Sequence, residues 1–305
     1  MQESDHSWPA LPYAEWQDSC ATLQLWTQIV GKIRMAQMPA VNHWWHVPLY
    51  LTARGLTTGP MPHRGRSFQI DFDFIAHRLA IAASDGAENS IALVPRSVAA
   101  FYGDLMGRLE ALGLGVEIWP MPVEIPAPIP FAEDSVHESY DREAVNRFWR
   151  ALLQIDRVLK EFRARFLGKV SPVHFFWGSF DLAVTRFSGR TAPPPPHHPV
   201  IPDSVNREAY SHEVSSCGFW PGNGGFGQPA FYAYAYPEPP GFAAAIAAPA
   251  DAYYAKEIGE FILPYEVVRR SAAPREMLLE FLQTTYAAAA DHGKWDRAAL
   301  ERGAR

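Results

Sequence analysis

The sequence predicts an α+β fold, a mainly antiparallel sheet packed by long helices. Three observations support this class. Segments with strand-like alternation recur along the chain, and two long segments carry apolar residues at helical spacing. Aromatic residues make up 13% of the chain and prolines number 27, which favours a sheet-rich core with stiff, irregular connections. At 305 residues with 48% hydrophobic and 20% charged residues, the chain can form one large domain or two of ordinary size.

The first predicted α+β half covers residues 1–125. Its apolar spacing predicts a first helix at 14–35, and Ser97 is a suitable N-cap for a second helix that ends before Gly113. Alternating apolar and polar residues predict strands between these helices, and the segment that follows them can form one more. The expected strands are residues 42–56, 68–74, 78–83, 90–94 and 116–119.

A proline-rich connection at 120–136 leads into a second α+β half at 137–295. The second half opens with the strongest helical pattern, residues 140–166, and Pro274 marks the start of a last helix that runs to about residue 290. Between these helices we expect strands at residues 173–190, 209–219, 230–236 and 261–268. The polyproline segment 191–203 should be an exposed loop, and residues 296–305 a C-terminal tail.

The segment 173–190 organises the rest of the prediction. As one extended strand it is apolar on both faces, with His174 and Phe176 on one face and Trp177 and Asp181 on the other. Burying His174, Asp181 and Arg186 there costs several kcal/mol unless each is paired. These three residues therefore either satisfy one another or await a ligand.

The two halves follow the same order of helix, strands and helix. Residues 49–59 can be laid on residues 179–189 without a gap. This pattern leaves an internal duplication and two unrelated halves as equal alternatives. A duplication would place a ligand at the interface between the halves.

Charge and composition exclude several classes of protein. The net charge is −6, and no basic stripe is present that would neutralise phosphates, so nucleic acid is not an expected partner. The N-terminal residues lack the pattern of a signal peptide, and no apolar run is long enough for a membrane span. Two distant cysteines, Cys20 and Cys217, fit a reduced, cytoplasmic compartment.

Four long strings carry a family resemblance: NHWWHVPLYLTARGLTT at 42–58, VHFFWGSFDLAVTRFSGR at 173–190, AYSHEVSSCGFWPG at 209–222 and FYAYAYPEP at 231–239. Together they resemble an uncharacterised bacterial family, a domain of unknown function. The resemblance spans nearly the whole chain and implies a bacterial, cytoplasmic, stand-alone protein. It implies no activity, so the chemistry has to be argued from the residues alone.

Three histidines, His46, His174 and His212, lie in predicted strands. If the strands are neighbours, the imidazoles could converge with Asp181 or Glu213 on a zinc or iron ion. No HExxH or HxH spacing supports a metal site, so separately satisfied core histidines are the preferred interpretation, and no metal ligand is assigned.

Cys217, beside a glycine-rich turn, could be a nucleophile with His212 as its base. Alternation places these two side chains on opposite faces, which favours a buried, unreactive thiol. The GNGG sequence at 222–225 lacks the lysine and helix of a phosphate loop and is interpreted as a mobile turn or lid.

An aromatic wall is the other candidate feature. Tyr232 and Tyr234 share one face of their strand, with alanines on the other face, and Trp177 and Trp220 lie in neighbouring motifs. Such a wall either stacks a flat ligand or packs beneath a helix.

Charged residues offer two further alternatives. Arg54 and Arg186 could hold an anionic group, or Arg186 could pair with Asp181. Asp71 and Asp73 are expected to face water rather than to serve as a carboxylate pair.

The sequence therefore predicts a protein that binds a small molecule or an enzyme of the hydrolase or transferase type. In this hypothesis His46, His174 and His212 supply hydrogen bonds or proton transfer, and Asp181 orients a histidine. The alternative is a non-catalytic interaction protein whose polar residues form a closed internal network. No cofactor and no oligomeric state are assigned.

Overall fold

The computed structural model describes residues 8–197 and 200–303, and its fold is α+β, as predicted. Two six-stranded antiparallel sheets form its framework. In the first sheet the order is β1-β2-β4-β5-β6, and β3 also pairs with β4. Its strands are β1 (Tyr50–Leu51), β2 (Gly55–Thr57), β3 (Met61–His63), β4 (Arg66–Asp73), β5 (Arg78–Ala83) and β6 (Glu88–Ala92).

The second sheet has the order β11-β12-β10-β9-β8-β7. Every neighbouring pair of its strands is antiparallel. Its strands are β7 (His174–Phe176), β8 (Asp181–Thr191), β9 (His212–Trp220), β10 (Ala230–Tyr236), β11 (Tyr253–Ala255) and β12 (Glu260–Pro264).

Helices surround the two sheets. The α-helices are α1 (Gln17–Gln37), α2 (Val98–Ala111), α3 (Arg142–Ala164), α4 (Asp203–Ala209), α5 (Tyr265–Arg270), α6 (Pro274–His292) and α7 (Arg297–Leu300). Short 3₁₀ helices are η1 (Tyr13–Glu15), η2 (Asn42–Trp44) and η3 (Phe242–Ala244). The Ser97 hydroxyl caps α2 by accepting from the Ala100 amide, and Pro274 starts α6, so both predicted helix starts are confirmed.

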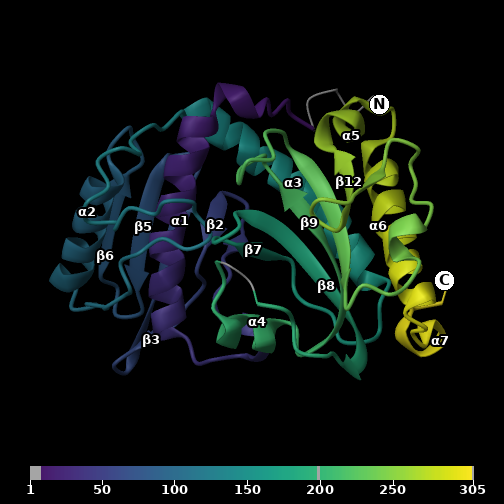
Figure 1. Cartoon of the computed structure of the whole chain (residues 1–305). Coiled ribbons are helices and arrows are strands. Elements are labelled where there is room, and N and C mark those ends of the chain that lie inside the picture. The colour runs from purple at the N-terminus through teal and green to yellow at the C-terminus, as the bar shows by residue number, and fades with distance from the viewer. Residues whose placement is uncertain (1–7, 198–199, 304–305) are drawn as a thin grey trace.

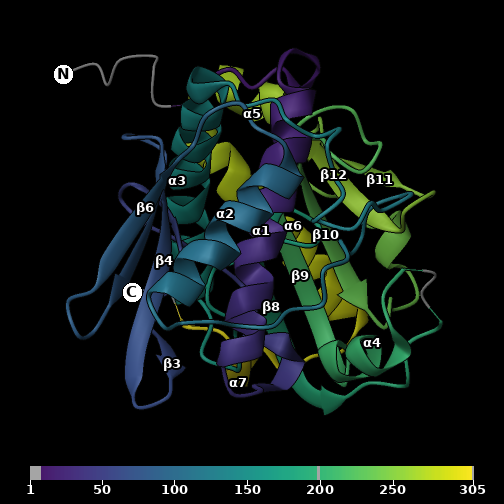
Figure 2. The same ribbon diagram turned by 90° about the vertical axis from the view of Figure 1, so that its left-hand side faces the viewer.

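The two sheets meet at one edge of each. Leu49, just before β1, and Phe175 in β7 exchange two main-chain hydrogen bonds of 3.0 Å. Figure 2 shows the first sheet on the left, the second on the right and α1 between them. One continuous hydrophobic core contains residues of both halves.

Helices α3 and α6 contact the second sheet along β8, β9 and β10 (Figure 1). On β8, the buried Arg186 lies over the ring of Phe162 from α3 and the ring of Tyr286 from α6. Side chains alternate along a strand, so Asp181, which lies an odd number of positions from Arg186 on β8, points to the other face of the sheet.

The segment 173–190 is a hairpin, so its prediction as one strand is wrong. Residues 177–180 turn between β7 and β8, and Phe180 takes a positive φ of 63°. Phe176 pairs directly with Asp181 in the hairpin. Paired residues share a face, so His174, Phe176 and Asp181 lie on one face of the sheet, contrary to the parity of an uninterrupted strand.

Other predicted boundaries also change. Residues 42–56 contain η2, β1 and the start of β2 instead of one strand, because His43 and Trp44 have positive φ and Gly55 packs against the backbone of Phe72. Residues 116–119 form no strand, and residues 265–268 belong to α5.

At two further places the structure contains helices that the sequence analysis lacked. Helix α4 begins at the last residue of the predicted polyproline loop, of which residues 198 and 199 lie outside the described part. The predicted tail includes α7, and the Leu167 amide donates to the Leu300 carbonyl at 2.7 Å. The predicted pairing of 68–74 with 78–83 is confirmed by β4 and β5.

Within residues 8–197 and 200–303, no helix combines the length and the apolar character needed to cross a membrane.

Candidate functional site

A cavity of about 790 Å³ lies on the face of the second sheet opposite to α3 and α6. Its floor is formed by side chains of β8, β9 and β10, and its walls come from α1, the segment around η2, the proline-rich connection and α4. Helix α4 also contacts η2. Residues far apart in the sequence therefore enclose a single space.

Strand alternation explains which side chains reach the cavity. Tyr232 and Tyr234 of β10 line it, whereas Ala233 and Ala235 belong to the core on the side of α6. The predicted division of this strand into a tyrosine face and an alanine face is confirmed. Small alanines allow the helix to approach closely, and the tyrosines are left facing the open side.

Asp181 is the most deeply buried carboxyl of the cavity, with 4% of its surface exposed. Two hydroxyls, Ser179 Oγ and Tyr232 OH, donate hydrogen bonds to its two oxygens. Burial raises the pKa of Asp181 to about 6, and the two hydroxyls lower it in part. The expectation that Asp181 orients a histidine is wrong, because its side-chain partners are these hydroxyls.

Gly218 makes the Tyr232–Asp181 contact feasible. It lies in β9 directly between Ala183 of β8 and Tyr232 of β10. A β-carbon on Gly218 would stand 2.5 Å from the Tyr232 hydroxyl, a distance that atoms do not tolerate. Without that β-carbon, the tyrosine side chain can cross β9 and reach the carboxyl on β8.

Aromatic rings extend the same wall. The ring of Trp220 stacks on Tyr232 with centroids 4.4 Å apart and an interplanar angle of 27°. Tyr234 lies beside Tyr232 with a centroid distance of 6.2 Å, and its hydroxyl is 2.8 Å from that of Tyr210. Flat, amphipathic rings with hydroxyls at the edge are typical of sites for small organic ligands.

Two glutamates that the sequence analysis did not select also line the cavity, Glu124 and Glu260. Burial raises the pKa of Glu124 to about 7 and that of Glu260 to about 8, and the charge of Asp181 adds to both shifts. The Glu124 side chain is exposed and the Glu260 side chain is half-buried, and the pKa of Glu124 is shifted less than that of Glu260.

Local sequence explains why these glutamates were missed. Glu124 has a φ of 55° and lies in a proline-rich connection without periodicity, held against the α-carbon of Gly178. Glu260 precedes the apolar run Phe261–Leu263 and looks like an ordinary polar strand start. Only for Glu260 was there a usable signal, namely a charged residue at the end of a buried strand.

Lys32 is a third cavity residue, after Glu124 and Glu260, that was not predicted from the sequence. It projects from α1 into the cavity with 1% of its surface exposed. Its Nζ lies 4.8 Å from the ring centroid of Trp119 and 5.8 Å from that of Trp177. Burial lowers the pKa of Lys32 to about 8. The signal was a lysine among the apolar residues of a buried helical segment, next to Val30 and Ile33.

A second basic group borders the cavity at His43. The Lys169 ammonium donates to His43 Nε2 at 2.6 Å, so Nδ1 carries the proton and donates to the Ala209 carbonyl at 3.1 Å. Ala209 ends α4, and this hydrogen bond therefore ties α4 to η2. Burial lowers the pKa of His43, and the charge of Lys169 adds to this effect.

Of the ten residues chosen from the sequence, six line this cavity. They are His46, Trp177, Asp181, Trp220, Tyr232 and Tyr234. Trp177 packs against Gly31 of α1, and its Nε1 donates to the Val47 carbonyl at 2.9 Å. His46 Nδ1 accepts from the Val41 amide at 3.2 Å.

The other two histidines lie outside the lining. His174 is 1% exposed, and neither ring nitrogen has a hydrogen-bond partner among the described residues. The rings of Trp45, Tyr50 and Phe176 surround it at 5.3 to 5.8 Å. His212 contacts the His43 ring edge-on at 5.6 Å. The structure therefore does not bring the three histidines together at one point.

The two arginines have structural partners. Arg186 donates to the Phe162 carbonyl and lies 3.5 Å above the Phe162 ring, on the helix side of the sheet. Its predicted pairing with Asp181 is wrong, because the two side chains leave opposite faces of β8. Arg54 pairs with Asp73 at 2.8 Å in the first sheet, so Asp73 is not a free carboxylate facing water.

Two alternative chemistries receive no support from the geometry. Among the described residues, no three histidine, cysteine, aspartate or glutamate side chains are placed to share a metal ion. Cys217 is buried, its Sγ faces the Val184 carbonyl at 3.6 Å, and burial raises its pKa to about 12. This thiol is the unreactive, buried kind that alternation favoured.

Comparison with known proteins adds a family. Residues 8–302 match the model of a family of unknown function, DUF5996. The chain belongs to this family. No curated protein and no solved structure matches it. The predicted resemblance to an uncharacterised family is therefore confirmed.

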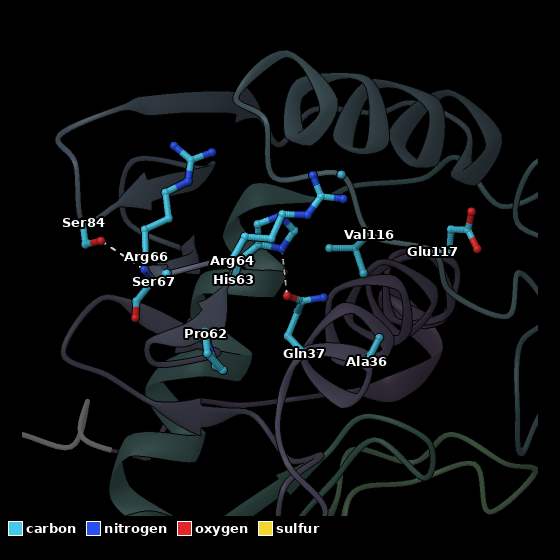
Figure 3. Close-up of a pocket in the computed structure, with 12 residues that line it drawn as sticks. Ala36, Gln37, Pro62, His63, Arg64, Arg66, Ser67, Ser84, Val116 and Glu117 are labelled. Atoms are coloured by element: carbon cyan, nitrogen blue, oxygen red, sulfur yellow. Dashed lines mark hydrogen bonds between the residues drawn. The ribbon is translucent and has the colours of Figure 1, made fainter.

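The DUF5996 chain has a second hollow of about 750 Å³ on the first half of the molecule (Figure 3). Its basic side chains do not converge: Figure 3 shows the guanidinium groups of Arg64 and Arg66 directed to different sides. Arg66 already binds Asp85 and the carbonyl oxygens of Leu112 and Gly113. The cavity of the second sheet is therefore the better candidate site of this DUF5996 protein.

Proposed function

We propose that this DUF5996 protein binds a small organic molecule in the cavity of the second sheet and transfers a proton to or from it. The observation that carries the proposal is the buried Asp181, held by Ser179 and Tyr232 at the wall of an aromatic cavity. Buried carboxyls at such walls are enriched at functional sites.

The acid–base part of the proposal follows from protonation. A catalytic group works best when its pKa lies near the working pH, and burial raises the pKa of Asp181 to about 6. Near neutral pH the carboxyl can therefore exist in both forms, with the Tyr232 hydroxyl as its hydrogen-bonded partner. Protonation of a leaving group fits a hydrolase or transferase type of reaction.

The aromatic part of the proposal concerns the shape of the ligand. Trp220 and Tyr232 present stacked rings, and Trp177 closes the cavity against α1. A flat molecule gains the most from such walls. His46 contributes a ring at the same cavity, so the expected lining of aromatic and histidine side chains belongs to this proposal.

The test is a thermal-shift screen of a metabolite library against the wild type and two variants. Ala183→Leu adds volume on the cavity floor, and Ala82→Leu makes the same change at an exposed position of the first sheet. Ligands of the cavity should stabilise the wild type and Ala82→Leu but not Ala183→Leu. Hits that stabilise all three proteins equally, or no hits, would contradict the proposal.

Turnover separates an enzyme from a binding protein. Each hit is incubated with the wild type and with Asp181→Asn, and its consumption is followed by mass spectrometry. We expect Asp181→Asn to lose turnover even at ligand concentrations that saturate the variant. Turnover that is unchanged in Asp181→Asn would remove this residue from the mechanism.

We further propose that the two halves are an internal repeat. Each half has a leading helix, α1 or α3, an antiparallel sheet, and a closing helix, α2 or α6. The cavity draws α1 and η2 from one half and its floor from the other. Both cysteines are free thiols, which supports the proposed cytoplasmic setting, and the proposed bacterial origin follows from the family resemblance.

The alternative, a non-catalytic interaction protein with a closed polar network, is not favoured. His174 and Arg186 are enclosed by aromatic rings, and neither His174 nitrogen has a hydrogen-bond partner among the described residues, whereas a closed polar network requires such partners. Asp181 lines an open space together with two glutamates.

A further inference from the structure

The acidic side of the cavity lacks a compensating cation. Asp181, Glu124 and Glu260 all line it, and none of them forms an ion pair in the described part of the chain. Asp181 has only hydroxyl partners, and Glu260 Oε2 is buried without any hydrogen-bond partner there. Buried carboxyls are costly unless they are protonated or paired, so a ligand cation would find acceptors without a charge partner in Asp181 and Glu260.

On the basic side of the cavity, the cation Lys32 lacks an anionic partner among the described residues. Lys32 is 99% buried and lines the same cavity, yet within residues 8–197 and 200–303 it makes no hydrogen bond or ion pair. Its ammonium faces only the rings of Trp119 and Trp177. A ligand anion placed there would supply the charge partner that the protein does not provide.

The two sides lie apart along the sheet. Lys32 stands beside Trp177, which follows the edge strand β7. Asp181 begins β8, and Glu260 begins β12, three strands further along the order. Strands are about 4.8 Å apart, so the acidic groups extend away from the lysine across the sheet. Aromatic side chains, Trp220 and Tyr232, occupy the floor between β8 and β12.

From this arrangement we infer that the ligand is a flat organic zwitterion, with an acidic group that pairs with Lys32 and an ammonium group that lies on the acidic side of the cavity, where Asp181 and Glu260 stand. The inference rests on the proposed function, because it assumes that the cavity is the binding site. It adds the charge and the polarity of the ligand, which the proposed function leaves open.

Four probes with the same ring test the inference. They are 4-(aminomethyl)benzoate as the zwitterion, 4-methylbenzylamine as the cation, 4-methylbenzoate as the anion and 4-methylbenzyl alcohol as the neutral compound. Their dissociation constants are measured by isothermal titration calorimetry at pH 7. We expect the zwitterion to bind tightest and the alcohol weakest, with each charge improving affinity about tenfold.

Two pairs of variants assign the charges to residues. Lys32→Met should remove the advantage of the zwitterion over the amine and leave the affinity of the amine unchanged. Glu260→Gln should weaken the amine and the zwitterion but not 4-methylbenzoate. The exposed Lys256→Met and Glu257→Gln are the matched controls and should change no affinity.

Several results would overturn the inference. They are an alcohol that binds as tightly as the amine, an anion that binds tightest, a Lys32→Met effect on the amine equal to that on the zwitterion, or no binding of any probe. If the probes bind without the expected order and Ala183→Leu abolishes their binding, the cavity remains the site and only the zwitterion is excluded. If Ala183→Leu leaves their binding intact, the proposed function fails as well.

Discussion

The Tyr232 hydroxyl donates a hydrogen bond to the Asp181 carboxyl across a strand that intervenes between them. The two residues lie on β10 and β8, and the intervening β9 carries Gly218 at the crossing point. The geometry of the candidate site therefore depends on the absence of a β-carbon at Gly218.

Gly218→Ala should disrupt this contact. A β-carbon there would meet the Tyr232 hydroxyl at 2.5 Å and also the Leu182 carbonyl, which cannot move out of the sheet. We expect a loss of about 1–3 kcal/mol in the free energy of unfolding by urea, typical of overpacking. As a control, Gly103→Ala lies in α2 with no atom within 4 Å and should gain roughly 0.5–1 kcal/mol. Equal effects of both variants would contradict the assigned role of Gly218.

Tyr232→Phe tests the hydrogen bond itself. The variant keeps the ring that stacks on Trp220 but leaves Asp181 with Ser179 as its one side-chain partner. We expect a loss of about 1–3 kcal/mol in unfolding free energy, the cost of an unsatisfied buried group. The pKa of Asp181 should rise further, since the hydroxyl lowers it, and carbon-13 NMR of the carboxyl can follow the change. Tyr236→Phe, which removes a bond to the exposed Pro193 carbonyl, should cost less than 1 kcal/mol by the same reasoning.

Glu260→Gln should change how stability depends on pH. Burial raises the folded-state pKa of Glu260 to about 8, above its ordinary 4.5, so the fold favours the neutral acid. The stabilising contribution is complete below pH 4.5 and is lost as the pH rises to 8. At pH 7 the glutamine variant should therefore be more stable than the wild type by about 2–3 kcal/mol, and at pH 4 the two should agree. Parallel curves from urea unfolding over this range would refute the assignment.

The strand patterns predicted the tyrosine wall but not Glu124 and Lys32, which line the same cavity. Alternation in 230–236 placed Tyr232 and Tyr234 on one face because a strand exposes every second residue to the same side, whatever its neighbours. Glu124 and Lys32 reach the cavity from a loop and a helix whose position is set by packing over long range. Local periodicity carries no information about such an approach.

The hairpin at 173–190 shows a second limit. Its residues have strand propensity throughout, so the sequence pattern extends smoothly from Val173 to Arg190. The turn depends on a positive φ at Phe180, a residue type that rarely adopts it, and on the room at Gly178 for the Glu124 side chain. One unforeseen turn placed His174 and Asp181 on the same face of the sheet, whereas alternation along a single strand puts them on opposite faces.

Arg186 should be replaceable without loss of ligand binding. It lies on the helix side of β8 with Nε and Nη1 unpaired among the described residues, so its charge contributes little that an apolar side chain cannot. Arg186→Met should leave unfolding free energy within about 1 kcal/mol of the wild type. Arg186→Ala should cost about 2–5 kcal/mol, because it leaves a cavity between Phe162 and Tyr286. Loss of probe binding in a stably folded Arg186→Met variant would show that this residue serves the site after all.

His174 should make the protein sensitive to acid. Burial, together with the charges of Arg34 and Arg163, lowers the pKa of His174 to about 3, below its ordinary 6.5. The fold therefore favours the neutral imidazole, and this contribution is complete above pH 6.5 and is lost as the pH falls toward 3. At pH 5 the loss amounts to about 2 kcal/mol relative to pH 8. His174→Phe keeps a ring between Trp45, Tyr50 and Phe176 but cannot be protonated, so its unfolding free energy should fall less between pH 8 and pH 5 than that of the wild type. An equal fall in both proteins would mean that other groups govern acid unfolding and that His174 is protonated at little cost in the folded state.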